Sequence, residues 1–128
     1  MLVDLDEFTR HYIICALWAE NDQSNEQGGD PLDANYDIED IAPECLIQIK
    51  ADCAKFQAEN ANDIITWNNG RYSAEEMAGH DFWLTRNGHG SGFWDGDWEQ
   101  EVGKRLTEAS AKFGTVTLYV GDDGKIYC

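Results

Sequence analysis

The sequence predicts a single α+β domain, with three main helices packed on one face of a small, mostly antiparallel sheet built from two hairpins. Three segments repeat apolar residues at steps of three and four, which is the period of an amphipathic helix. Two others combine strand-favouring residues with glycine-bearing turns. The length of 128 residues is that of one domain, so we expect residues 1–128 to share one core.

The first helix is expected from Asp4 to Glu20, with Asp4 as its N-terminal cap. Residues 21–37 then read as a loop, because polar residues, glycines and a proline break the helical period. Leu32 and Tyr36 are the large apolar residues of this loop, and we expect them to hold it against the core.

A second helix is expected over Pro43–Asn60, since proline fits the first turn of a helix. Its buried stripe contains Leu46, Ile49, Cys53 and Phe56. Residues 60–63 interrupt the pattern before a further helical turn. A short helix then begins at Ser73, where Glu76 completes a capping box, and ends at Gly79.

The stretch from His80 to Trp98 concentrates aromatic residues, glycines and ionisable groups, and both helix and strand fit its first half. We favour a hairpin, with His80–Arg86 as one strand and Ser91–Trp94 as the other, because Asn87-Gly88 is a strong tight-turn signal. The residues that favour strand over helix here are Phe82, Trp83 and Thr85.

A third long helix follows, capped by Asp95 or Asp97 and ended by Gly114, with Glu101 and Arg105 as an i,i+4 pair. Its apolar face contains Trp98, Val102, Leu106, Ala109 and Phe113. The chain ends in a second hairpin, with strands over residues 115–120 and 125–127.

Negative charge is concentrated in one part of the chain. The formal net charge is −16, and nine acidic residues and no basic residue occur from Glu20 to Glu44. Such a field repels nucleic acid and anionic membranes and attracts basic protein surfaces. We therefore expect no direct nucleic-acid binding and no membrane binding. The alternative is that the acids serve only solubility.

The expected binding surface lies in this acidic segment, where carboxylates would imitate the phosphates of a nucleic acid and an aromatic side chain would anchor the contact. It consists of Glu20, Asp22, Glu26, Asp30, Asp33, Tyr36, Asp37, Glu39 and Asp40. The partner would be a protein with a basic surface. The oligomeric state stays open.

An enzyme site is the second hypothesis, formed by His80, Asp81, Arg86 and His89. Histidine and aspartate would act as acid and base, and arginine would clamp an anionic group. In a hairpin, however, His80 and His89 lie about 20 Å apart, from about 3.3 Å per residue. The alternative pairs Arg86 with Asp81 or with an acid on a helix, and leaves the histidines capping turns.

We expect no metal site and no cofactor. The alternating acids Asp95, Asp97 and Glu99 resemble the start of a calcium loop, but Gln100 and Leu106 stand where that loop needs Gly and Glu. A weaker Mg²⁺ site is the alternative at these acids, but helix capping explains them more simply. The sequence also lacks the G-x-S-x-G motif of a serine hydrolase and the Lys-Ser/Thr that completes a phosphate-binding loop.

The cysteines do not form a C-x-x-C pair. We expect Cys15, Cys45 and Cys53 to be buried thiols, and the state of Cys128 stays open. The acidic N-terminus lacks the pattern of a signal peptide, and no run of 18 apolar residues occurs. These features favour a cytoplasmic location.

The segment GHDFWLTRNGHGSGFWD resembles a stretch shared by small acidic proteins encoded in bacteriophage genomes. The resemblance extends to YIICALW near the start, LDANYDIEDIAPE before the second helix and LYVGDDGKIY at the end, and so covers most of the chain. It implies a phage origin and action inside the infected bacterium. It implies no catalytic residue.

Three hypotheses follow. The first is a phage accessory protein that inhibits or redirects a host protein, such as a defence nuclease or CRISPR effector, by nucleic-acid mimicry. The second is an enzyme acting on nucleotides or nucleic acid, centred on His80, Arg86 and His89. The third is a nucleotide-binding sponge in which Trp83, Trp94 and Arg86 hold the ligand.

Overall fold

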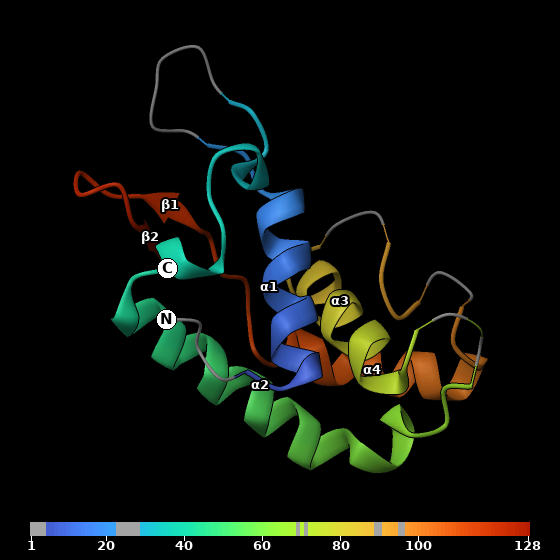
Figure 1. The fold of residues 1–128 in the computed structure, drawn as a ribbon. Helices are drawn as coiled ribbons and strands as arrows, with labels where there is room; N and C mark the ends of the chain where they lie inside the picture. The colour runs from blue at the N-terminus through green and yellow to red at the C-terminus, as the bar shows by residue number, and fades with distance from the viewer. Residues whose placement is uncertain (1–4, 23–28, 69, 71, 89–90, 95–96) are drawn as a thin grey trace.

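The computed structural model describes residues 5–22, 29–68, 70, 72–88, 91–94 and 97–128. Within them, four helices pack beside a small sheet (Figure 1). The helices are α1 (Glu7–Ala19), α2 (Pro43–Ile64), α3 (Ala74–Arg86) and α4 (Gln100–Ala111), with short 3-10 helices η1 (Leu32–Ala34) and η2 (Ile38–Asp40). The strands β1 (Tyr119–Val120) and β2 (Ile126–Tyr127) pair antiparallel. The α+β prediction is confirmed in this coarse form.

The expected first hairpin is wrong, because residues 80–86 lie in α3. Three helices on one face of a two-hairpin sheet is therefore not the arrangement that the described residues form. The helix begins with the predicted capping box, in which Ser73 Oγ accepts from the backbone N–H of Glu76 at 3.1 Å. Asn87 and Gly88 end this helix instead of turning a hairpin, and Gly88 has a φ of +70°.

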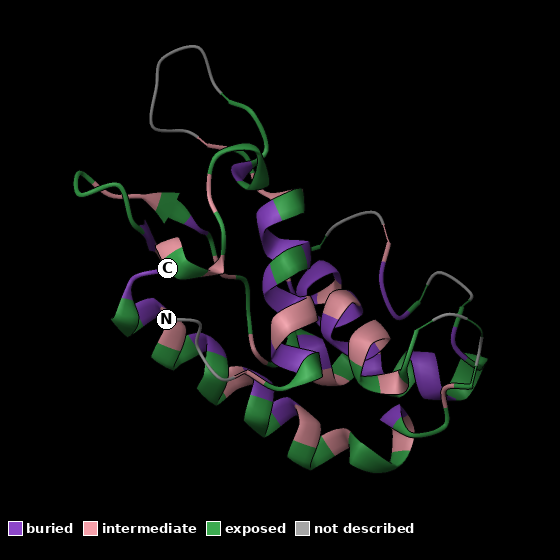
Figure 2. Ribbon diagram, in the orientation of Figure 1, coloured by how far each residue is buried: buried purple, intermediate pink, exposed green. Residues whose placement is uncertain are grey.

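Gly79 does not end the helix either. It lies inside α3 against α1, where a Cβ would collide with the carbonyl oxygen of Phe8. Only glycine permits the two helix backbones to approach so closely. In Figure 2, buried residues occur along both α1 and α3, and exposed residues follow the outer side of α2.

Aromatic side chains from three helices fill the core. Phe56 of α2 stacks on Phe82 of α3 with ring centroids 4.2 Å apart, and Phe8 of α1 contacts both rings. Phe56 and Phe82 are fully buried, and so is Trp83. This packing explains why residues with a preference for strands form a helix here, since tertiary contacts outweigh local propensity.

The helix caps differ from the predicted ones. Asp6 caps α1 by accepting from the backbone N–H of Thr9 at 2.8 Å, and Asp4 lies outside the described residues. Glu99 caps α4. Asp97 is therefore not the cap of this helix, and Asp95 is a further residue that the structure does not describe.

Helix α2 continues past its expected end. Asn60 has non-helical backbone angles, but the helix resumes and reaches Ile64. The resumed turn carries Asp63, which accepts two hydrogen bonds from Arg105 at 2.8 and 2.9 Å. These bonds lower the pKa of Asp63. Arg105 thus pairs with α2 and not with the expected Glu101.

The second hairpin is confirmed, with strands shorter than expected, and a disulfide joins it to α2. Cys45 and Cys128 form this bond, so the expectation of a free thiol at Cys45 is wrong. The backbone N–H of Ala42 donates to the carbonyl of Ile126 at 2.8 Å. Ile126 is fully buried, so the hairpin packs against the segment that precedes α2.

None of the described helices combines the length and the apolar character that crossing a bilayer requires.

Replacing Gly79 with alanine tests the close approach of α1 and α3. Helix propensity alone would raise the free energy of unfolding by about 1 kcal/mol. We expect a decrease of about 2 kcal/mol instead, because the added methyl group must push the helices apart. Urea unfolding measures the change. The control is Ala54→Gly at an exposed helical position, which measures the effect of helix propensity alone in this protein. A Gly79→Ala variant more stable than the unmodified chain would contradict the close packing of α1 on α3.

Thiol labelling tests the state of the cysteines. Cys15 and Cys53 are buried free thiols, and burial raises the pKa of both, that of Cys15 to about 12. We expect Ellman's reagent to label no thiol quickly in the native protein, and two after unfolding without reductant. In the Cys15→Ser variant, the number of thiols labelled after unfolding falls to one. Rapid labelling of Cys45 in the untreated native protein would contradict the disulfide.

Candidate functional site

The predicted enzyme residues separate on α3. His80 and Asp81 are neighbours, whereas Arg86 lies more than one turn further along the helix and has different partners. His89 lies outside the described residues. The structure therefore brings together a histidine and an aspartate but not the arginine that would clamp a substrate.

Arg86 is enclosed in the core and engaged by protein acceptors. Its Nε donates to the carbonyl of Gly114 at 2.8 Å, and its Nη2 donates to the carbonyl of Phe113 at 3.0 Å. Its Nη1 donates to Asp52 at 2.9 Å and to the Tyr12 hydroxyl at 3.1 Å. Asp52 lies on α2, so the alternative in which Arg86 pairs with a helix acid is confirmed.

The surroundings of Arg86 explain how a buried cation is tolerated. The guanidinium lies 5.3 Å from the ring centroid of Phe82 and 5.7 Å from that of Phe113, within range of cation–π attraction. Burial raises the pKa of Tyr12 far above its ordinary value, so its phenol stays neutral beside the ion pair. Arg86 is therefore a structural cross-link among helices and not an anion clamp.

Asp81 fixes the segment before α4. It is 1% exposed and accepts from Trp98 Nε1 at 2.7 Å and from His80 Nδ1 at 3.1 Å. The Trp98 ring also packs on Trp67, with centroids 4.7 Å apart. A carboxylate that orients a histidine is one part of an acid–base site, but its other oxygen holds a structural tryptophan here.

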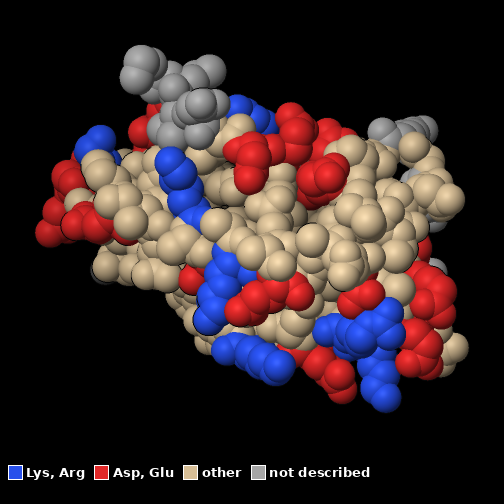
Figure 3. Space-filling view, turned by 90° about the horizontal axis from the view of Figure 1, so that it is seen from below, with Lys and Arg blue, Asp and Glu red and all other residues tan. Residues whose placement is uncertain are grey.

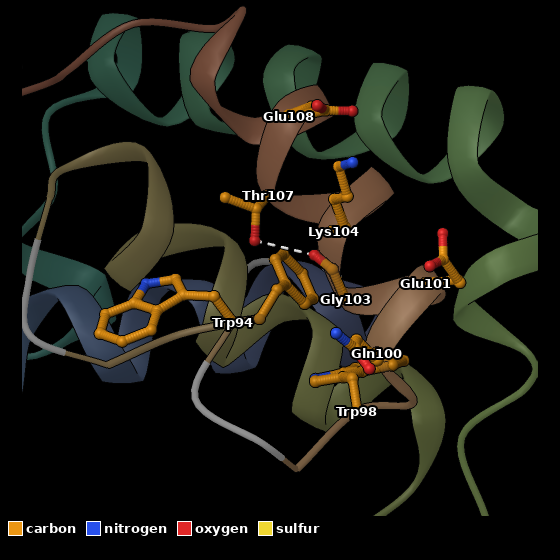
Figure 4. Close-up of a pocket in the computed structure, with 9 residues that line it drawn as sticks. Trp94, Trp98, Gln100, Glu101, Gly103, Lys104, Thr107 and Glu108 are labelled. Atoms are coloured by element: carbon orange, nitrogen blue, oxygen red, sulfur yellow. Dashed lines mark hydrogen bonds between the residues drawn. The ribbon is translucent and has the colours of Figure 1, made fainter.

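A groove of about 870 Å³ opens beside α4 (Figure 4). The residues that line it include Phe93, Trp94 and Trp98, together with Lys104 and Thr107 of α4. In Figure 4 the indole of Trp94 points away from Trp98, and its side chain is largely exposed.

The sponge hypothesis in its predicted form is wrong. Trp83 is fully buried and Arg86 almost so, whereas Trp94 lies on the surface. These three side chains cannot hold one ligand between them. The buried Nε1 of Trp83 has no hydrogen-bond partner among the described atoms.

The acidic segment that joins α1 to α2 is held by backbone hydrogen bonds. Asp22 donates to the carbonyl of Asp30 at 2.9 Å, and Leu32 donates to the carbonyl of Glu20 at 2.8 Å. Leu32 is fully buried and Tyr36 is half-buried against the core, so both predicted anchors are confirmed. Glu26 lies outside the described residues.

Two of the acids also stabilise the segment itself. Asp37 Oδ1 accepts from the backbone N–H of Glu39, and Asp40 Oδ2 accepts from the backbone N–H of Asp37, both at 2.9 Å. These bonds cap η2. The exposed members of the predicted surface are Asp30, Asp33, Asp37 and Glu39, and the half-buried ones are Glu20, Asp22, Tyr36 and Asp40.

The C-terminal hairpin enlarges this surface. Ile41 bridges Ile126, and Figure 1 shows the hairpin beside the segment that joins α1 to α2. We call the described residues 20–22, 29–44 and 119–128 the acidic end. It contains ten acidic residues and one basic residue, Lys125. The acids of the hairpin join this surface only through tertiary packing. The order of charges along the sequence therefore could not predict that they belong to it.

The rest of the surface is mixed in charge. Lys50 and Lys55 lie on α2, and Lys104, Arg105 and Lys112 lie on α4 or at its C-cap. Figure 3 shows Lys and Arg side chains among Asp and Glu on the face seen from below. The negative charge is therefore concentrated at the acidic end.

A cluster that the sequence did not predict lies between α1 and α3. His11 Nε2 is 3.2 Å from Glu76 Oε2 and 3.8 Å from Glu7 Oε2. The i,i+4 spacing of Glu7 and His11 was a visible signal. Glu76 joins them only because the two helices pack side by side, and it also serves in the capping box.

Removing the Arg86 side chain tests its structural role. We expect Arg86→Met to lower the free energy of unfolding by about 2 kcal/mol or more, because the buried Tyr12 hydroxyl and the half-buried Asp52 both lose their hydrogen-bond donor. Arg105→Met removes an exposed ion pair and should cost less than about 1 kcal/mol. Urea unfolding of both variants measures the difference. Equal effects would show that the Arg86 network contributes no more than a surface pair.

The chain was also compared with known proteins. No family model, no curated protein and no solved structure matches it.

Proposed function

We propose that this chain is a binding protein that docks its acidic end on a basic surface of another protein and thereby inhibits or redirects that protein. The observation that carries the proposal is the composition of the acidic end, which contains ten acidic residues and one basic residue. A surface of this kind complements the groove with which a nucleic-acid-binding protein holds phosphates. The specific form of the proposal is nucleic-acid mimicry.

The folded state of the acidic end supports this function. The backbone bonds of Glu20, Leu32 and Ala42 hold the segment on the core, so its carboxylates are positioned before binding. A positioned segment loses less conformational entropy when it binds than a free one. Binding strength then depends on the charges and on a few aromatic contacts.

Aromatic anchors are present beside the carboxylates. Tyr119 of β1 is 54% exposed and stacks on Tyr127 of β2, with ring centroids 5.8 Å apart. Tyr36 belongs to the predicted surface and is half-buried. Tyrosine is enriched among residues that dominate binding energy, so these side chains are the expected contacts around which the carboxylates act.

The biological setting comes from the resemblance to small bacteriophage proteins. We place the chain in the cytoplasm of an infected bacterium, as an accessory protein whose target is a nucleic-acid-binding host protein such as a defence nuclease or CRISPR effector. The enzyme alternative has less support, because Arg86 is enclosed and, of its described residues, only His80 and Asp81 are in contact.

Charge reversal tests the proposal. A tagged chain is used to capture its partner from phage-infected cells, and the affinity for the purified partner is then measured at several salt concentrations. We expect the triple variant Asp30→Lys, Asp33→Lys, Glu39→Lys to bind at least about tenfold more weakly, because three exposed carboxylates are lost. Duplex DNA should compete with the unmodified chain for the partner.

A matched control changes the net charge by the same amount outside the acidic end. The exposed residues Glu59, Glu75 and Glu108 are replaced by lysine together. This variant should retain affinity within about threefold, since charges farther than a Debye length of about 10 Å act weakly. Equal binding by both triple variants, or the absence of any basic partner in the capture, would contradict the proposal.

A further inference from the structure

We propose that Glu7, His11 and Glu76 form a binding site for a divalent transition-metal ion of the zinc type. The three residues offer one imidazole nitrogen and two carboxylate oxygens, and these ligand atoms all lie within 4.8 Å of one another. The site joins α1 to α3. It differs from the expectation that the chain binds no metal, and it is independent of the proposed function.

The distances match those between ligands of a small ion. Zinc lies about 2.0–2.1 Å from histidine nitrogen and about 2.0–2.2 Å from carboxylate oxygen, so ligands at tetrahedral corners are about 3.4 Å apart. His11 Nε2 is 3.2 Å from Glu76 Oε2 and 3.8 Å from Glu7 Oε2. Two edges of the tetrahedron are therefore nearly formed, and the exposed Glu7 side chain can adjust the third.

The fold holds two of the ligands in place. Glu76 Oε1 accepts from the backbone N–H of Ser73 at 2.8 Å, which fixes the carboxylate and leaves Oε2 directed at His11. Hydrogen bonds of this kind orient metal ligands in known sites. Gly79 lies one turn beyond Glu76 and lets α3 approach α1 closely. This approach brings the His11 imidazole within reach of the Glu76 carboxylate.

The donor set selects the class of ion. Imidazole nitrogen suits zinc, copper, iron and nickel, whereas calcium and magnesium prefer oxygen ligands. Three protein ligands leave at least one coordination position for water or for a group from a binding partner.

A protonated His11 paired with the two glutamates is the competing arrangement, and metal titration distinguishes the two. The disulfide-intact chain is stripped with a chelator and titrated with Zn²⁺ by calorimetry and with Co²⁺ by visible absorption. We expect one ion per chain and a Co²⁺ spectrum without the intense near-ultraviolet bands of thiolate ligands. The measured Zn²⁺ affinity should fall at least tenfold in His11→Ala.

The ligand variants separate metal binding from helix capping. Glu76→Gln keeps a side chain able to accept from Ser73 but removes a carboxylate, so it should weaken Zn²⁺ binding about tenfold with little loss of stability. Glu75→Gln removes the neighbouring exposed charge and should leave the affinity unchanged.

The outcomes that overturn the site are equally specific. An unmodified chain that binds neither ion, or one whose Zn²⁺ affinity survives His11→Ala, has no metal site at this position. His80→Ala serves as the histidine control, because His80 contacts Asp81 and lies outside the cluster.

Discussion

The contact between α1 and α3 brings two charged residues of α3, Arg86 and Glu76, to partners on α1. With Gly79 against the backbone of Phe8, the two helices run side by side, and each further pair of facing residues follows from that approach. Tyr12 contacts Arg86 at the C-terminal end of α3, and His11 contacts Glu76 near the N-terminal end of α3. A buried cation and an ionisable cluster thus depend on the same missing Cβ atom.

The sequence predicted the elements whose evidence is local. Periodic apolar residues indicated α1, α2 and α4, and the Ser73–Glu76 capping box indicated the start of α3. The central stretch was misread because its evidence is not local. Phe82 and Trp83 prefer strands in isolation, and the aromatic core that holds them in a helix is assembled from distant segments.

The same distinction applies to the site residues. The acidic segment is visible in the sequence because nine acids and no base occur from Glu20 to Glu44, and its anchors Leu32 and Tyr36 were the only large apolar residues within residues 21–37. The partner of Arg86 was not predictable in particular, since Asp52 lies 34 positions earlier on another helix. The pairing of Cys45 with Cys128, 83 positions apart, was equally invisible to spacing rules.

That disulfide has a mechanical consequence. It closes a covalent ring from α2 to the last residue of the chain, and this ring contains α3, α4 and the hairpin. A force applied at the C-terminus, by a tether or by an unfolding protease, is therefore transmitted to Cys45 and not to β2. The hairpin therefore cannot unfold before the rest of the ring. An unfolding protease that pulls on Cys128 must thread the ring as two chain segments side by side, because the disulfide keeps them joined.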